Sequence, residues 1–167
     1  MTDRLAFLEG LIGKSYRLGA AGPDEFDCYG LAQHIQRNLY AVQMPDLPFV
    51  AATTRSQAEA MLNHAERQNW TEVSDAEAQD GDIVLMGNVL ARDFHLGTFV
   101  VPVTAGVVIH VDQGRGVVAD DLPALRAIGF TYTRLFRRIP ATSTAPRNSR
   151  RTRRPAERRS SLSRSAT

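Results

Sequence analysis

The chain has 167 residues, enough for one domain with its own hydrophobic core, and its 43% hydrophobic and 7% aromatic content is that of an ordinary soluble globular protein. A single cysteine excludes an internal disulfide and leaves too few thiols for a thiolate metal cluster. The N-terminal residues contain the acids Asp3 and Glu9, and no apolar run reaches the length of a membrane span, so neither a secretory signal nor a membrane anchor is expected. We therefore expect a protein made and kept in the cytoplasm, unless a larger assembly carries it out.

The net charge of +2 is unevenly distributed along the chain. Eight arginines and one glutamate follow position 146, a charge of +7, which leaves −5 for residues 1–146. Residues 141–167 consist almost entirely of Ser, Thr, Pro, Ala and Arg, with Leu162 as their only large apolar side chain. Such a segment buries too little surface to offset the entropy of ordering it. The sequence therefore predicts a folded domain over residues 1–140 and a disordered arginine-rich arm over residues 141–167.

Removing residues 141–167 is expected to leave the stability of the folded domain almost unchanged, because so little of the arm can be buried. The melting temperature of residues 1–140 should lie within about 2 °C of that of the full chain, the effect of a stability change below roughly 0.5 kcal/mol. Calorimetry of the two proteins side by side checks this. A large fall in melting temperature on truncation would show that the arm is docked.

Helical periodicity marks the first part of the chain. Residues 3–12 predict a short amphipathic helix whose apolar positions are Leu5, Leu8, Leu11 and Ile12. Gly13 and Gly19 then bracket a loop that carries Tyr16. Further along, residues 41–54 contain two prolines and predict an extended connection, and residues 55–69 predict another amphipathic helix.

The best-marked helix begins after Asp27, a residue typical of the N-cap position. Phe26, just before the cap, can pack on Leu31 in the manner of a hydrophobic staple. The apolar face of this helix consists of Leu31, Ala32, Ile35 and Leu39.

After Trp70 the periodicity changes to that of strands. β-rich runs separated by turn residues occupy 81–86, 95–101, 106–111, 116–119 and 130–138. Helices followed by strands indicate an α+β domain with an antiparallel sheet, onto which the N-terminal helices pack.

Cys28 would be the first helical residue after the Asp27 cap. Unpaired N–H groups and the positive end of the helix dipole stabilise a thiolate there and lower the pKa of the thiol. A lone cysteine is more often a small buried apolar residue. First-turn positions behind an N-cap are commonly exposed, however, so the position favours a nucleophile, which needs an imidazole as base and a third group to orient that base.

Of the four histidines, two lie on predicted strands. If PVTA is the turn between these strands, Val101 pairs with Gly106 and Gly97 with His110, and His95 then lies on the same face as His110, diagonal to it. A one-residue slip would place the two histidines on opposite faces. Two histidines on strands are, taken alone, slightly more often structural than catalytic. His34 in the helix and His64 on a charged face are interpreted as structural or solvated residues.

Together these residues resemble the NlpC/p60 cysteine peptidases of bacterial cell walls. The matching segments are GKSYRLGAAG, FDCYGL, GDIVLM, HLGTFV and VVIHV, in this order, within residues 5–138. The resemblance implies a papain-like α+β fold. It implies that Cys28 is the nucleophile, with its thiol near one ring nitrogen of the general base His95, and that His110 orients the base from the other nitrogen. Tyr16 would bind the oxyanion together with the backbone N–H of Cys28.

The resemblance also implies a substrate and a setting. It suggests hydrolysis of amide bonds in peptidoglycan stem peptides, through a thioester and without a metal or cofactor. Secreted members of the family usually have Ser after the nucleophile, whereas this chain has Tyr29. The DC-aromatic-GL form resembles the phage-tail branch, which also occurs in tail tips of gene transfer agents. Phage-like tail proteins are therefore expected partners, and a virion or tail particle is the expected location.

Two other functions are compatible with the sequence. The domain could be a structural or assembly component of a tail tip with little or no hydrolytic activity. The arginine-rich arm could contact DNA, acidic envelope polymers or a partner protein without specificity, through its charge. Specific nucleic-acid recognition is not favoured, because the arm has no aromatic residue for base stacking and no folded motif.

Overall fold

A computed structural model describes residues 2–46, 68–90 and 94–140 of the chain. The predicted helix at 55–69 with His64, and the predicted arm at 141–167, lie outside these residues except for positions 68 and 69. The predicted extended connection at 41–54 is described only up to residue 46, and those six residues form neither helix nor strand. No helix in the described residues is long and apolar enough to cross a membrane.

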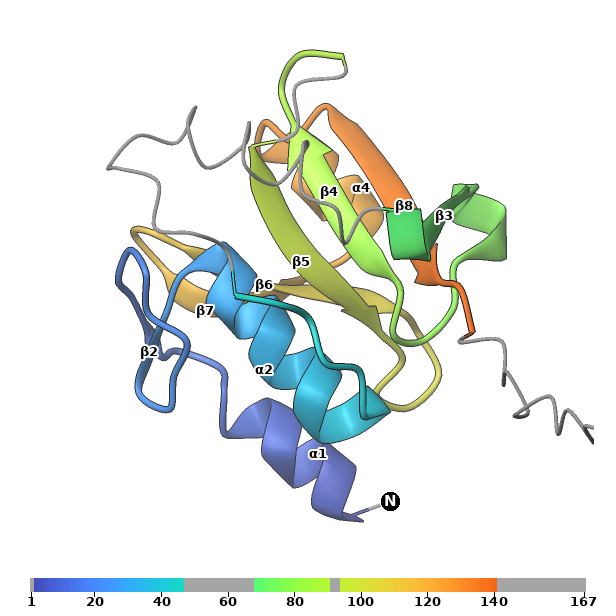
Figure 1. Ribbon diagram of the computed structural model, residues 1–167. Helices are drawn as coiled ribbons and strands as arrows, with labels where there is room; N and C mark the ends of the chain where they lie inside the picture. The colour runs from blue at the N-terminus through green and yellow to red at the C-terminus, as the bar shows by residue number, and fades with distance from the viewer. Residues whose placement is uncertain (1, 47–67, 91–93, 141–167) are drawn as a thin grey trace, which may run out of the picture.

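Helices α1 (Thr2–Glu9) and α2 (Cys28–Tyr40) precede most of the strands in the chain, and Figure 1 shows them together on one side of the molecule. Two short strands, β1 (Ser15–Tyr16) and β2 (Glu25–Phe26), pair in parallel between them. The elements that follow are β3 (Trp70–Val73), a 3-10 helix (Asp75–Glu77), β4 (Ile83–Gly87), β5 (His95–Val100), β6 (Val107–Asp112), β7 (Gly116–Asp120), α4 (Leu122–Ala127) and β8 (Tyr132–Arg138).

Six strands form one sheet in the order β3-β8-β4-β5-β6-β7, with every neighbouring pair antiparallel. The predicted α+β class is therefore confirmed. The register between β5 and β6 is also the predicted one, since Thr98 pairs with Ile109 and Val100 pairs with Val107. The predicted pairing of Gly97 with His110 continues the same register.

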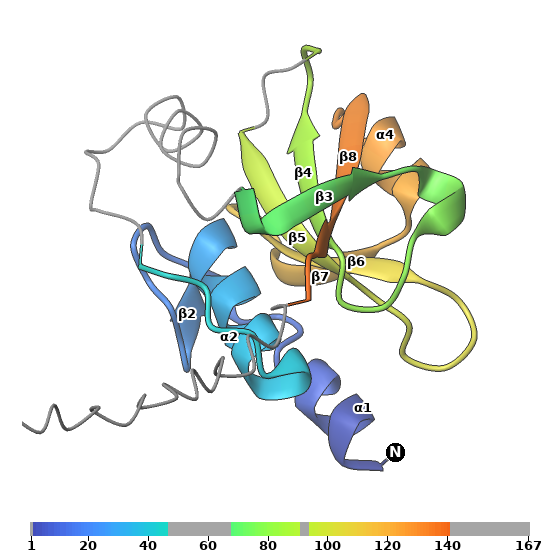
Figure 2. The ribbon, with the colours of Figure 1, turned by 45° about the vertical axis from the view of Figure 1, so that its right-hand side comes forward.

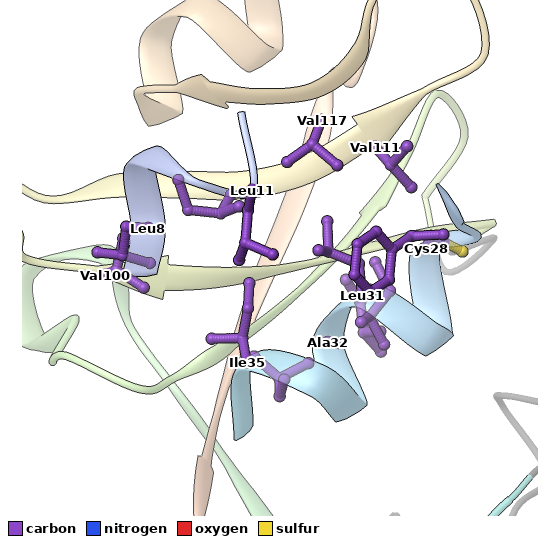
Figure 3. Close-up of a cluster of buried hydrophobic side chains, with 14 of the residues drawn as sticks. Leu8, Leu11, Cys28, Leu31, Ala32, Ile35, Val100, Val111 and Val117 are labelled. Atoms are coloured by element: carbon purple, nitrogen blue, oxygen red, sulfur yellow. The ribbon is translucent and has the colours of Figure 1, made fainter. Parts of the chain in front are cut away.

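Alternation along the strands gives the sheet two apolar faces. One face, with Leu96 and Ile109, packs against Leu31 and Ile35 of α2 in a single buried cluster that also receives Leu8 and Leu11 (Figure 3). The other face, with Phe99 and Val108, packs with Leu125 of α4 in a second cluster. Figure 2 shows α1 and α2 well apart from α4, which lies beside β8. The predicted packing of α2 on the sheet is confirmed, with Leu39 partly buried against the first cluster.

The helix predicted over residues 3–12 is shorter than expected. It ends at Glu9, because the N–H groups of Leu11 and Ile12 bond to carbonyls three residues back and Gly13 then takes a positive φ of 83°. Only Leu8 and Leu11 of its four predicted apolar positions are buried; Leu5 and Ile12 are exposed. The helix contacts the core over a narrower stripe than its sequence indicates.

The short strands β1 and β2, strand β3, the 3-10 helix and helix α4 were not predicted from the sequence. Strand β3 pairs with β8 at one edge of the sheet, and α4 follows β7. Helix α4 has an N-terminal signature that its short length obscures: the Asp121 side chain accepts from the N–H of Ala124 at 2.7 Å, and Pro123 stands in the first turn.

Gly30→Ala is expected to destabilise the protein by at least about 1–3 kcal/mol, the usual cost of forcing an extra methyl group into a packed site. A Cβ at this position would lie 2.2 Å from the carbonyl oxygen of Ala20 and 2.7 Å from the Cα of Ala21. Both are backbone atoms, so the loop that covers the first turn of α2 would have to move. Thermal unfolding of the variant measures the effect.

Gly114→Ala is the matched control for that substitution. An added Cβ there meets only Asp112 Oδ1, at 3.4 Å. Its stability should stay within about 0.5 kcal/mol of the parent protein. Equal stability of the two alanine variants would contradict the close approach of the loop to α2.

Candidate active site

The start of α2 has the predicted capping arrangement. Asp27 Oδ1 accepts from the N–H of Gly30 at 2.7 Å, and Asp27 Oδ2 accepts from the N–H of Gly19 at 2.8 Å. The carboxylate thus caps the helix and also ties the preceding loop to its first turn. Cys28 is the first helical residue, as the sequence indicates.

The exposure predicted for Cys28 is wrong. The residue is 6% exposed and belongs to the cluster beneath α2. Its neighbour Gly30 meets the loop backbone at Ala20, and this loop, together with β5, covers the end of the helix. In Figure 3 Cys28 lies at one margin of the cluster, and its sulfur points away from the other labelled side chains.

The predicted lowering of the thiol pKa is wrong as well. Burial, and after it the nearby Asp27 carboxylate, raises the pKa of Cys28 to about 12. Backbone hydrogen bonds from Leu96, Tyr29 and Cys28 itself act in the opposite direction. The N–H groups expected at a helix start therefore do face the sulfur, but they do not outweigh the loss of solvent. The resting thiol is protonated at neutral pH.

His95 and His110 lie on one face of the sheet, as predicted. His95 Nε2 and His110 Nδ1 are 3.0 Å apart, and the ring planes are almost perpendicular at 85°. The match follows from the register of β5 and β6, in which a slip by one residue would have separated the two rings. His110 therefore lies beside His95, at the position expected from the sequence.

Phe130, which follows α4, stacks on the His95 ring with centroids 5.0 Å apart and planes within 7°. Burial, followed by the neighbouring His110, lowers the pKa of His95 to about 3. The imidazole is accordingly neutral at physiological pH, the form that accepts a proton. The contact of Phe130 with His95 could not be predicted from the sequence, because it depends on the path of the chain through α4.

The sequence interpretation missed Asp120, which is hydrogen-bonded to His110. Its Oδ2 atom is 3.0 Å from His110 Nε2, and it also accepts from Arg115 Nη2 at 3.0 Å. The residue ends β7 one position beyond the predicted strand. The hairpin register, in which His110 pairs with Val118 and Val108 with Asp120, places the carboxylate on the histidine face. If residues 112–116 (DQGRG) are taken as the turn between the two strands, the resulting register places Asp120 on the same face as His110.

Tyr16 reaches the site from β1, where it pairs with Phe26 of β2. Burial raises the pKa of its hydroxyl, a hydrogen bond with the Gln113 side chain lowers it, and the nearby Cys28 and Asp27 raise it. The net shift is upward, so the hydroxyl keeps its proton at neutral pH and can donate it to a hydrogen bond. Tyr16 is half-buried beside the start of α2.

The structure brings these residues together to different degrees. His95, His110 and Asp120 are joined by hydrogen bonds, whereas Cys28 meets β5 at the backbone of Leu96, the residue after His95. Among the described residues no hydrogen bond joins the Cys28 sulfur to His95, so the thiol–imidazole contact stays a prediction. His34 is half-buried and stacks on Phe7 away from the site, as expected for a structural residue.

Alkylation of Cys28 by iodoacetamide is expected to be slow at pH 7 and to rise on the order of tenfold per pH unit up to about pH 10, since the rate follows the thiolate fraction. The reason is the raised pKa of the buried thiol. Rates from mass spectrometry give the profile, and the denatured chain, with an ordinary thiol pKa, serves as reference. A plateau below pH 8 would contradict a protonated resting thiol.

Comparison with known proteins agrees with this fold. NlpC2 from Trichomonas vaginalis superimposes with a TM-score of 0.52 at 23% identity, over 81% of this chain and 45% of that one. A protein similar to a lipoprotein of the NLP/P60 family, from Staphylococcus aureus, gives 0.51 at 18% identity, over 85% and 43%. The chain thus spans less than half the length of these two proteins.

A further solved structure is the NlpC/p60 domain of the peptidoglycan hydrolase SagA, with a TM-score of 0.47 at 19% identity, over 71% of this chain and 86% of that one. No curated protein matches the sequence. In the comparison with protein families, residues 13–125 match the NlpC/P60 family. These residues run from the loop before Tyr16 through β7 and into α4. The match covers more than half of the chain, and the protein therefore belongs to the NlpC/P60 family.

Proposed function

We propose that this protein is a cysteine peptidase that hydrolyses amide bonds in peptidoglycan stem peptides. The observation that carries the proposal is the hydrogen-bonded pair of His95 and His110 on β5 and β6, with Cys28 at the start of α2 against the backbone of Leu96. A thiol at a helix start, a neutral imidazole and a group that orients it are the components of nucleophilic amide hydrolysis. Membership of the NlpC/P60 family supports the same role for each of them.

In the first half of the reaction, Cys28 Sγ attacks the carbonyl carbon while its proton passes to His95. Because the resting thiol is protonated and the resting imidazole is neutral, proton transfer accompanies attack instead of preceding it. The oxyanion would accept hydrogen bonds from the Cys28 N–H and the Tyr16 hydroxyl. The intermediate then expels the amine, which takes the proton from His95, and a thioester remains on Cys28.

In the second half, His95 takes a proton from a water molecule that attacks the thioester carbonyl. Collapse of the second tetrahedral intermediate breaks the carbon–sulfur bond, and the thiolate regains the proton from His95. The carboxylic acid product leaves, and the neutral pair is restored. No cofactor takes part in this sequence of steps.

The specific setting is proposed from the resemblance of the motif FDCYGL to the phage-tail branch of the family. We place the protein in the tail tip of a phage or a gene transfer agent, made in the cytoplasm and carried outward in the particle. Its bond would be the γ-D-glutamyl–diamino-acid bond that members of the family commonly cut. The arginine-rich residues 141–167 would contact acidic polymers or tail proteins through their charge.

Incubation of the purified protein with peptidoglycan fragments, followed by mass analysis, tests the proposal. New fragments with the masses of a cut stem peptide are expected, and the mass identifies the bond. The Cys28→Ser protein under the same conditions should release none of them. Intact fragments after prolonged incubation with the parent protein would contradict the enzymatic role.

The alternative function is a structural component of the tail tip with little or no activity. The burial and raised pKa of the Cys28 thiol favour it, because a buried protonated thiol is otherwise inert. The fragment assay separates the two functions, because a structural component would release no product. Such a component would also assemble with its neighbours equally well when Cys28 is replaced by Ser.

A further inference from the structure

Three side chains continue the site beyond His95 as one hydrogen-bonded chain. His95 Nε2 meets His110 Nδ1 at 3.0 Å, and His110 Nε2 meets Asp120 Oδ2 at 3.0 Å. His110 is fully buried and the Asp120 side chain is 17% exposed, so water competes little for these bonds. Each of these four hydrogen-bonding atoms has one partner among the other three. This restricts where the protons of the two rings can lie.

The far end of the chain is an ionised carboxylate. Burial raises the pKa of Asp120, but hydrogen bonds from Arg115 and His110 outweigh it, and the net shift is downward. Arg115 Nη2 donates to the same Oδ2 atom at 3.0 Å, which holds the carboxylate in place. An ionised carboxylate only accepts hydrogen bonds, so the proton between Asp120 and His110 belongs to His110 Nε2.

The proton on His110 Nε2 also determines which nitrogen of His95 carries a proton. A neutral imidazole with a proton on Nε2 has a bare Nδ1, which accepts a hydrogen bond. His110 Nδ1 therefore accepts from His95 Nε2, which must carry the proton of that ring. Both rings are neutral, since burial lowers the pKa of each. The remaining nitrogen, His95 Nδ1, is left without a proton.

We infer that Asp120 is a positioning residue that fixes the tautomers of His110 and His95 and thereby presents His95 Nδ1 as the nitrogen that accepts the proton of Cys28. Asp120 acts on the thiol indirectly, through its hydrogen bond with His110 and the hydrogen bond of His110 with His95. Phe130, stacked on His95, keeps the plane of the ring fixed while the hydrogen bonds fix its protons. The catalytic consequence rests on the proposed function, but the tautomers themselves do not.

Nuclear magnetic resonance of the ¹⁵N-labelled protein tests the inference without substrate. Two-bond proton–nitrogen correlations distinguish an imidazole nitrogen that carries a proton from a bare one. In the parent protein both rings should carry the proton on Nε2. In Asp120→Ala, His110 loses its acceptor, so both rings should populate the Nδ1–H form. Because β7 is an edge strand and Asp120 is partly exposed, the variant is expected to fold.

The matched control is Asp75→Ala, which also removes a carboxylate paired with an arginine, but one whose partner is Arg126 and not a histidine. It should leave both tautomers unchanged. If Asp120→Ala retains the parent tautomers, the inference fails. A proton on Nδ1 of His95 in the parent protein would also overturn the inference, and this measurement needs no variant.

Activity provides a separate reading. Asp120→Ala should lower kcat on the order of 10–10²-fold, the scale for losing the outer partner of a functional histidine, while KM changes little. Asp120→Asn retains an oxygen for Arg115 and His110 and should lose less. Should the parent protein hydrolyse no peptidoglycan fragment, the proposed function fails, and the tautomers still decide the role of Asp120. A full kcat in Asp120→Ala with altered tautomers would overturn the catalytic part of the inference.

Discussion

Cys28→Ser and His95→Ala are each expected to lower kcat by at least about 10⁴-fold, the scale on which loss of a nucleophile or its base acts. Serine is nearly isosteric with cysteine, but at its normal pKa it is a much poorer nucleophile than a thiol paired with an imidazole. If His95 is the base, His95→Ala leaves the thiol, whose pKa is raised to about 12, without a group to deprotonate it. Release of product from peptidoglycan fragments measures both losses.

His110→Ala should be milder than His95→Ala by one to two orders of magnitude, because the third residue orients the base and transfers no proton itself. His34→Gln is the matched control, since His34 stacks on Phe7 and meets the Phe26 ring edge-on. It should lose stability without losing kcat. Equal activity of the His95→Ala and His34→Gln proteins would show that His95 is not the base.

Tyr16→Phe is expected to lower kcat on the order of 10²–10³-fold if its hydroxyl donates to the oxyanion, the usual cost of losing one such donor. The raised pKa keeps the hydroxyl protonated over the working pH range, so a donor is present in the parent protein. Because the donor acts in the transition state, KM should change little. Steady-state kinetics on a peptide fragment separates the two parameters.

Tyr132→Phe removes the same oxygen atom from an exposed tyrosine of β8 and serves as the control. Its kcat should match that of the parent protein. If Tyr16→Phe were equally active, the hydrogen bond with Gln113 would be the whole role of that hydroxyl, and the oxyanion assignment would be wrong.

Much of the site was predicted from the sequence, because its determinants are local. The N-cap at Asp27 places Cys28 at the first position of α2 through bonds that span three residues. The facing positions of His95 and His110 follow from a short hairpin whose turn, PVTA, fixes the register. Membership of the NlpC/P60 family, which the motifs around these residues indicate, is likewise confirmed over residues 13–125.

The tertiary structure alone decided the environment of these residues. Local pattern predicts an exposed thiol with a lowered pKa at Cys28, yet the loop at Ala20 and strand β5 cover it and raise the pKa. Asp120 and Phe130 reach the histidines only because β7 and α4 return to the same face of the sheet. Helix starts and hairpin registers depend on neighbours in sequence, whereas burial and the partners of a ring nitrogen depend on segments that are distant along the chain and meet only when the chain is folded.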